Sequence, residues 1–254
     1  MLIRYATGHR WYKEVTDEVI GQFGKNDAAR LRSTLKKVAA SGVRHVIEPL
    51  SDSFLDRFLP LYEKRILEKE NPTVFDIRTK TLGNPDKAKR YHSLSLYEEE
   101  RFLGGLIFSL KEDVLSIAYR TLANKWEAAN LQARPSLYVE YLISDHARVI
   151  GTKTIIHGKD RNPYGLNSSI GLANFKLSSG CRPQLPKKYE IATIETADLE
   201  RDALILEFPE VEAIHADIKK AYLVADAAGV EKWSALLKHD DRLHVEVSER
   251  KSVV

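Results

Sequence analysis

The sequence predicts a mixed α/β domain, and three observations support this fold class. Strand-like and helix-like stretches alternate over the first 190 residues in the order strand, helix, three strands, helix, strand, helix. The three central strand-like stretches follow one another after short polar turns, which is typical of an antiparallel meander. Of the 39 basic and 36 acidic residues, residues 190–254 hold 8 and 15, which leaves 31 and 21 in residues 1–189. We therefore expect an α/β domain over residues 1–190 and an acidic extension or small subdomain over residues 191–254.

The N-terminal third predicts two amphipathic helices around a strand. A helix capped by Asn26 or Asp27 and stopped by Gly42 has apolar residues at helical spacing. Its basic residues lie off that face, where they either are solvated or contact RNA phosphates. Residues 43–50 read as a strand, and a second helix follows Ser51. Pro60 lies inside that helix, where a kink or break is expected.

The middle of the chain carries a long polar run and then the meander. Residues 71–89 contain two prolines and a glycine, so we expect a long loop that covers or admits an acceptor. Strands are expected over residues 91–97, 101–110 and 114–122. The pair Gly104-Gly105 in the second strand indicates either a tight packing spot or a close approach to substrate.

After the meander the pattern predicts a helix, a buried strand and a short capped helix. Pro135 suits the first position of a helix that runs to about Ile150. Residues 152–158 read as a buried strand. In the short helix, Ser168 or Ser169 is expected to cap the start, and Gly180 supplies the left-handed residue past the end.

The acidic C-terminal part predicts further elements. We expect strands over residues 188–195 and 242–247, and helices over residues 210–228 and 231–238. This part is either a small added subdomain or an arm through which two copies form a homodimer.

Composition narrows the class of protein. No apolar run approaches the roughly 20 residues of a membrane span. The N-terminus lacks the basic residues followed by an apolar stretch that are typical of a secretory signal peptide. Cys181 is the only cysteine, which excludes an intrachain disulfide and fits a reducing cytoplasm. The residues from His239 to His244 match no established metal-ligand spacing, so no metal site is expected. Serine-hydrolase elbows, phosphate-binding loops and dinucleotide fingerprints are absent from the sequence.

The pattern Gly-Leu-x-x-Phe-Lys-x-x-x-Gly in Gly171–Gly180, followed by a proline, resembles the last helix of the Fem-type peptidyltransferases. These are a branch of the GNAT acetyltransferase superfamily. The resemblance extends over about residues 43–190 through the order of elements. It implies an acetyltransferase-like (GNAT) fold with an added acidic C-terminal segment.

The resemblance also implies where an acyl donor lies. In this superfamily the third meander strand splays from the following parallel strand, and the exposed backbone holds the donor. Here that backbone belongs to residues 114–122 and 152–158, and the free N–H groups at the next helix start suit a phosphate. The implied donor-binding residues are Ala118, Tyr119, Arg120, Ser136, Leu137, Tyr138, Ser168 and Ser169.

One departure from the superfamily leaves the donor open. The stretch before the helix at Pro135, residues 130–136, contains none of the glycines of the usual acetyl-coenzyme A loop. The remaining candidate donors are acyl-carrier protein, aminoacyl-tRNA and an acyl-coenzyme A that is bound in an unusual way, without that loop. No permanently bound cofactor is expected.

Amine acylation needs a base and a group that stabilises the oxyanion. The resemblance gives Lys176 the second role, with Asn174 as a hydrogen-bond donor beside it. Glu140 is the candidate base; its alternative is a surface glutamate stabilised by the helix N-terminus. Tyr164 is a candidate proton donor.

The sequence thus predicts an N-acyltransferase that moves an acyl or aminoacyl group from a thioester or tRNA ester to an amine on a small molecule or peptide. The excess of basic residues in residues 1–189 favours binding of a polyanionic ligand such as tRNA. The alternative for this charge balance is that the acidic C-terminal part simply packs against this basic part. The alternative is a non-catalytic, acetyltransferase-like module for RNA binding or assembly.

Overall fold

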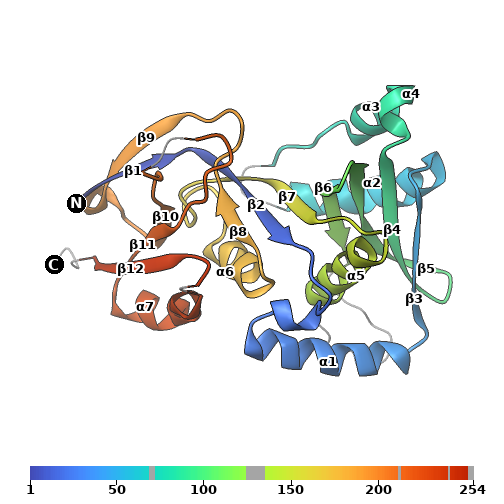
Figure 1. The fold of residues 1–254 in the computed structure, drawn as a ribbon, viewed down its shortest axis with the longest axis horizontal. Helices are drawn as coiled ribbons and strands as arrows, with labels where there is room; N and C mark the ends of the chain where they lie inside the picture. The colour runs from blue at the N-terminus through green and yellow to red at the C-terminus, as the bar shows by residue number, and fades with distance from the viewer. Residues whose placement is uncertain (69–71, 124–134, 211–212, 240, 251–254) are drawn as a thin grey trace. The chain divides into compact units, whose positions relative to one another are not determined.

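A computed structural model describes residues 1–68, 72–123, 135–210, 213–239 and 241–250 of the chain (Figure 1). These residues form two compact units. We call residues 15–156 the meander unit, and residues 1–14 together with 157–254 the terminal unit. The division differs from the expected boundary at residue 190. The physical reason is long-range pairing, because the first strand, β1 (Leu2–Ala6), pairs with β9 (Ile191–Glu195).

The meander unit is built on a sheet in the order β3-β4-β5-β6-β7. The first four strands pair antiparallel, and the start of β7 pairs parallel with β6. The predicted meander is confirmed to within one residue at each end. The strands are β3 (Val43–Pro49), β4 (Tyr91–Glu98), β5 (Arg101–Lys111), β6 (Val114–Leu122) and β7 (Thr154–Arg161).

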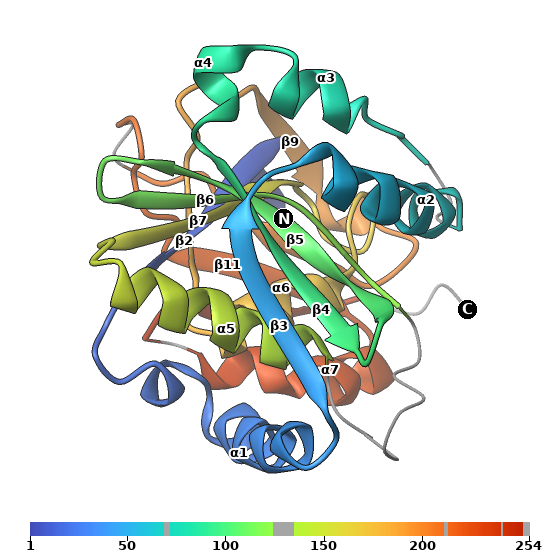
Figure 2. The same cartoon turned by 90° about the vertical axis from the view of Figure 1, so that its right-hand side faces the viewer.

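Helices cover both faces of this sheet (Figure 2). On one face α2 (Asp52–Leu67) and α3 (Ile77–Leu82) bury a core that includes Phe54, Phe58 and Ile107. On the other face α1 (Lys25–Ala39) and α5 (Pro135–Val149) bury the larger core of this unit. The three central strands, β4, β5 and β6, therefore contribute apolar side chains to both faces, as sheets covered on both sides do.

Three details of the meander unit differ from the sequence prediction. Helix α1 begins at Lys25 after Gly24 with no side-chain cap, because Asp27 lies inside the first turn and pairs with Arg30. Helix α2 continues through Pro60 without a break. Residues 77–82 and 85–88 form α3 and α4 (Pro85–Ala88) rather than an extended loop, because Asp76 and Asn84 cap them and Ile77 is buried.

The Gly104-Gly105 pair is a tight packing spot. Gly104 has φ +119°, and an added Cβ would lie 2.5 Å from the Thr121 carbonyl oxygen. A Cβ on Gly105 would lie 2.1 Å from the Leu94 carbonyl oxygen on β4. The two glycines let three strands of the meander approach closely.

Gly105→Ala is expected to lower the free energy of unfolding by about 1–3 kcal/mol, because a backbone carbonyl on the neighbouring strand blocks the new methyl group. Chemical denaturation measures this change. Gly21→Ala is the control in the same unit, since its methyl would meet only the Glu18 side chain, 3.3 Å from a carboxylate oxygen and 3.6 Å from Cβ. Equal losses in the two variants would contradict the explanation.

The terminal unit has a three-stranded sheet in the order β10-β11-β12, from β10 (Ala203–Leu206), β11 (Lys220–Ala225) and β12 (His244–Glu249). Leu204 and Leu206 pack with α6 (Ile170–Ser178), and Ala203 and Ile205 pack beside β1 and β9. Strand β2 (Gly8–Glu14) lies between β7 and β8 (Arg182–Gln184). The remaining pieces are α7 (Ala227–Trp233), η1 (Ile20–Gln22, in the meander unit), η3 (Thr196–Asp198) and η4 (Ser234–Lys238).

The C-terminal part was predicted least well. Strands near residues 188–195 and 242–247 are confirmed as β9 and β12, with shifted ends. The helix expected over residues 210–228 is wrong: residues 220–225 form the central strand β11, and the strand β10 was not predicted. The run Tyr222-Leu223-Val224 is buried on both faces of the sheet, and such a run carries neither helical nor alternating periodicity.

Among the described residues, none of the helices is long and apolar enough to span a membrane.

Candidate functional site

A buried ion pair lies beneath helix α6 in the terminal unit. The Lys176 Nζ atom donates to the Asp160 Oδ2 atom at 2.7 Å, and the two side chains are 8% and 12% exposed. Helix α6 carries the lysine and β7 carries the aspartate. Ser169 caps α6 by accepting from the Gly171 N–H, and Gly180 has φ +96°, so both predicted ends of this helix are confirmed.

Three further side chains join this ion pair into one network. The Tyr164 hydroxyl donates to Asp160 Oδ2 at 2.7 Å. The Trp11 Nε1–H lies 2.7 Å from the Tyr164 oxygen and 3.0 Å from Asp160 Oδ2. His9 Nε2 lies 2.7 Å from the same tyrosine oxygen. Four of the five side chains are buried, and Asp160 is nearly so.

The hydrogen bonds assign the tautomer of His9. The single hydroxyl proton of Tyr164 goes to Asp160, so the imidazole must donate from Nε2 to the tyrosine oxygen. The His9 Nδ1 atom is then an acceptor, and it has no hydrogen-bond partner among the described residues. Burial, only partly opposed by the Asp160 charge and reinforced by that of Lys176, lowers the pKa of His9 to about 3. The imidazole is therefore neutral near pH 7.

The pKa values of Asp160 and Tyr164 are shifted in opposite directions. Burial alone would raise the pKa of Asp160, but the Lys176 charge and the hydrogen bonds from Lys176 and Tyr164 hold it below its usual value. Burial and the Asp160 carboxylate raise the pKa of Tyr164 well above its usual value. The network thus holds one carboxylate, one ammonium, one neutral phenol and one neutral imidazole.

Tyr164→Phe is expected to lower the free energy of unfolding by about 1–3 kcal/mol, because the buried His9 donor loses its acceptor and Asp160 loses a donor. Thermal or chemical denaturation measures the loss. Tyr5→Phe is the control, since the Tyr5 hydroxyl makes no hydrogen bond to the part of the chain that the structure describes. An unchanged Tyr164→Phe stability would show that the network is not intact in solution.

The remaining predicted residues of the terminal unit have different roles. Asn174 lies on α6 and is half-buried, and its buried Oδ1 atom has no partner in the described part of the chain. Ser169 is the helix cap, and Ser168 bridges to Tyr164 through the backbone. The structure therefore brings Lys176 and Tyr164 together through Asp160 and gives the two serines structural contacts.

In the meander unit, Ala118, Tyr119 and Arg120 lie on β6. The ladder of β6 with β7 ends at the pair Ser116–Ile156, so these three residues lie past its end. Ala118 is the extra residue of a β-bulge, because Ile107 pairs with Tyr119 while Phe108 pairs with Ile117. Their predicted role toward a donor stays a prediction.

Glu140 was expected on the surface side of its helix, and this is wrong. Its side chain is fully buried and lies 3.6 Å from the Arg120 guanidinium. The start of α5 at Pro135 is confirmed, and Leu137 and Tyr138 are buried while Ser136 is half-buried. The glycine-free stretch at residues 130–134 lies outside the described residues.

Sequence reasoning missed three members of the network and one contact. Asp160, His9 and Trp11 were not candidates, although His9, Trp11 and Lys13 alternate along β2 and all three are buried. That alternation of polar and aromatic residues was the available signal. The structure also places His157 Nε2 at 3.3 Å from Cys181 Sγ, a histidine partner that the sequence did not indicate.

Comparison with known proteins addresses the fold. No protein-family model and no curated protein matches the chain. Among solved structures, FemX superposes with a TM-score of 0.52 at 12% identity, over 70% of this chain and 59% of FemX. The chain has the GNAT fold in its Fem-like form. L-PGS from Bacillus licheniformis is a more distant match, with a TM-score of 0.44 at 14% identity, over 66% of this chain and 50% of that one.

The Fem-like fold confirms the fold predicted from the Phe175-Lys176 motif and the order of elements. The chain spans 59% of the length of FemX. At 12% identity the likeness establishes the fold, so the chemistry has to be argued from the side chains of this chain.

Proposed function

We propose that this protein is an acyltransferase that moves an acyl or aminoacyl group from an activated ester or thioester to an amine. The observation that carries the proposal is the buried ion pair of Lys176 and Asp160 under α6. Burying two charges is costly unless they are paired and hydrogen-bonded. Even when paired, they often stabilise a fold no more than well-packed apolar residues would, so a buried ion pair calls for an explanation other than stability. A buried ammonium held in one orientation is suited to a developing negative charge.

Acyl transfer to an amine places negative charge on the carbonyl oxygen of the donor as the amine attacks. Lys176 is proposed to stabilise that oxygen. Asp160 holds the ammonium by a hydrogen bond of 2.7 Å, and Tyr164 and Trp11 in turn donate to the Asp160 carboxylate. Asn174 lies on the same helix, and its Oδ1 atom has no partner among the described residues, so we propose that it accepts a hydrogen bond from a substrate N–H group.

The network does not supply the base. The lowered pKa of His9, about 3, and the lowered pKa of Asp160 make both groups weak proton acceptors. The raised pKa of Tyr164 keeps its proton in place. The base therefore remains assigned to Glu140 as a proposal. The Arg120 guanidinium lies 3.6 Å from the Glu140 carboxylate.

The donor is proposed to be acyl-coenzyme A, acyl-carrier protein or aminoacyl-tRNA, with tRNA favoured by the glycine-free stretch before α5 and by the basic balance of residues 1–189. The backbone of Ala118, Tyr119 and Arg120, past the end of the β6–β7 ladder, is proposed to receive the donor. The proposed acceptor is an amine on a small molecule or peptide.

Transfer assays with a panel of acyl-coenzyme A, acyl-carrier-protein and charged-tRNA donors test the proposal, with small amines and peptides as acceptors. The informative variants are Glu140→Gln and the paired substitution Lys176→Met with Asp160→Asn, which removes both charges together. Lys187→Ala is the control, because Lys187 is exposed and takes no part in the network. Transfer by the wild type and the control, lost in the other two, is the expected result.

Absence of transfer with every donor would reject the proposal. The alternative, a non-catalytic RNA-binding module, then predicts tRNA binding whose affinity falls steeply with salt. A filter-binding titration at several salt concentrations measures that slope.

A further inference from the structure

The outer edge of β3 is a free sheet edge of the meander unit. β3 is the end strand of its sheet, and among the described residues its strand partner is β4 alone. Figure 2 looks onto this edge, and no other element of the meander unit lies in front of β3. Proteins usually cover or interrupt such an edge, because it can pair with another strand. The edge of β8 in the terminal unit is covered in this way, by a bridge between Gln184 and Asp217.

The pairing of β3 with β4 determines which of its backbone groups point outward. Facing residues in an antiparallel pair are hydrogen-bonded at every second position. The Leu50 N–H donates to the Tyr91 carbonyl at 3.0 Å, so in this register the even-numbered residues of β3 bond to β4. His45 and Ile47 therefore direct their N–H and C=O groups away from β4, and these groups have no partner in the part of the chain that the structure describes. Pro49 also has an outward position, where its missing N–H interrupts no hydrogen bond to β4.

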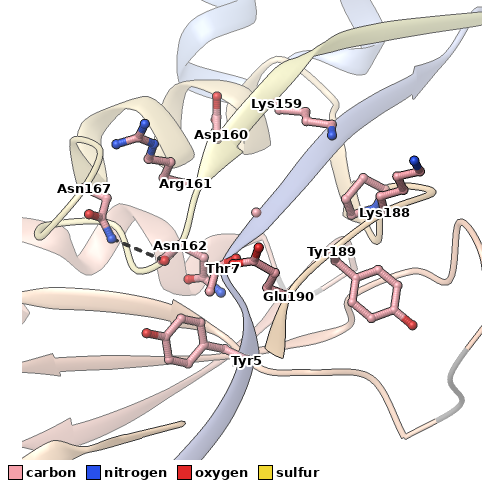
Figure 3. Close-up of a pocket in the computed structure, with 12 residues that line it drawn as sticks. Tyr5, Thr7, Lys159, Asp160, Arg161, Asn162, Asn167, Lys188, Tyr189 and Glu190 are labelled. Atoms are coloured by element: carbon pink, nitrogen blue, oxygen red, sulfur yellow. Dashed lines mark hydrogen bonds between the residues drawn. The ribbon is translucent and has the colours of Figure 1, made fainter. Parts of the chain in front are cut away.

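An apolar groove of about 470 Å³ lies beside the same edge, between β3 and the helices α1 and α5. Its aliphatic lining residues are Leu35, Val38, Ala39, Val43, Ile47, Leu142 and Val149. The open cavity of the terminal unit differs, because mainly charged and polar side chains line it (Figure 3). Covering the groove would remove apolar surface from water, including Val149, which is 67% exposed. The groove therefore favours association at this edge.

The sequence of β3 is complementary to itself when two copies pair antiparallel about a two-fold axis at Val46. In that register His45 lies opposite Ile47 of the second copy, and both residues carry outward backbone groups. Each such pair exchanges two hydrogen bonds. Val46 lies opposite Val46 of the second copy, and the two side chains pack across the new strand pair.

Charge favours the same register. Arg44 lies opposite Glu48 of the second copy, at positions where facing side chains come closest because no hydrogen bond joins the two residues. The Arg44 guanidinium is held 4.6 Å from the centroid of the Tyr97 ring, and its ion pair with the exposed Glu100 carboxylate is 3.7 Å long. Glu48 makes no ion pair with another described residue. The two-fold axis repeats the pair, so opposite charges meet at both ends of the strand pair.

We infer that β3 joins two copies of this chain, which pair edge to edge about Val46 and continue the sheet of the meander unit across the dimer. A single strand pair buries less surface than a standard interface, so the dimer is weak and forms at micromolar concentrations. The contact lies in the meander unit rather than in an arm formed by residues 191–254. The inference concerns association alone, so it stands or falls separately from acyl transfer.

Sedimentation velocity of the full chain at about 1 to 200 µM tests the inference. The informative variants are Arg44→Glu and Glu48→Arg, because each sets like charges opposite each other at both ends of the strand pair. Glu63→Arg is the control, since Glu63 is exposed on α2 and makes no ion pair within the described ranges. The melting temperature of each variant verifies that it folds.

The expected result is a dimer that is weakened roughly tenfold or more in either informative variant and nearly unchanged in the control. An equal mixture of Arg44→Glu and Glu48→Arg should dimerise again, because each facing pair then has opposite charges. A wild type that stays monomeric over the whole concentration range would overturn the inference. A mixture that does not associate would overturn it as well, and so would equal weakening in the control.

Discussion

Lys176→Met is expected to lower the rate of acyl transfer by about 10²–10³-fold and the free energy of unfolding by about 3–5 kcal/mol. Both effects have one physical origin. The substitution leaves the Asp160 carboxylate in a site where it is 12% exposed and has lost its only charged partner in the network. The hydrogen bonds from Tyr164 and Trp11 remain, but neither donor carries a charge.

A second substitution separates the two effects. Adding Asp160→Asn to Lys176→Met removes the uncompensated charge, so most of the lost stability should return while transfer stays low. Urea denaturation and single-turnover transfer measure the two quantities on the same samples. If transfer returned together with stability, the ammonium would have no role in the reaction and only the packing of α6 would matter.

Acidification is expected to destabilise the protein through His9, by about 2–3 kcal/mol between about pH 7 and pH 4.5. The pKa of this imidazole is 6.5 in the unfolded chain and about 3 in the fold. Between these values the unfolded state binds a proton that the folded state does not. Stability is therefore complete above about pH 6.5 and falls as the pH drops toward 3.

The contribution of His9 is isolated by comparing the wild type with His9→Gln, whose amide can donate to the same tyrosine oxygen without titrating. The pH dependence of the free energy of unfolding should be shallower in this variant over the same range. The lowered pKa of Asp160 removes stability in the same direction, but only below the usual carboxylate range near pH 4. His45 and His146 of the meander unit also have lowered pKa values, and they contribute equally to both proteins. Identical pH profiles for the two proteins would contradict the assignment.

The sequence by itself determined those helices and strands that are marked by residues within or next to them. The meander, the helix at Pro135 and the two ends of α6 follow from strand alternation, a proline at a helix start, a serine cap and a glycine with positive φ. Such signals act within a few residues of each other, so they can be read without knowing the fold. The Fem-like arrangement followed from their order, and Lys176 from its motif.

The tertiary structure decided what depends on distant residues. Asp160 and His9 are separated by about 150 positions in the chain, and they share the Tyr164 hydroxyl only because β2 lies beside β7. The same holds for the placement of β1 against β9 and for the burial of Glu140. A sequence pattern reports which residues face a core, and it does not report which residues meet there. The charge of Lys176 could therefore be proposed from the sequence, whereas the partners that hold it in place could be seen only in the fold.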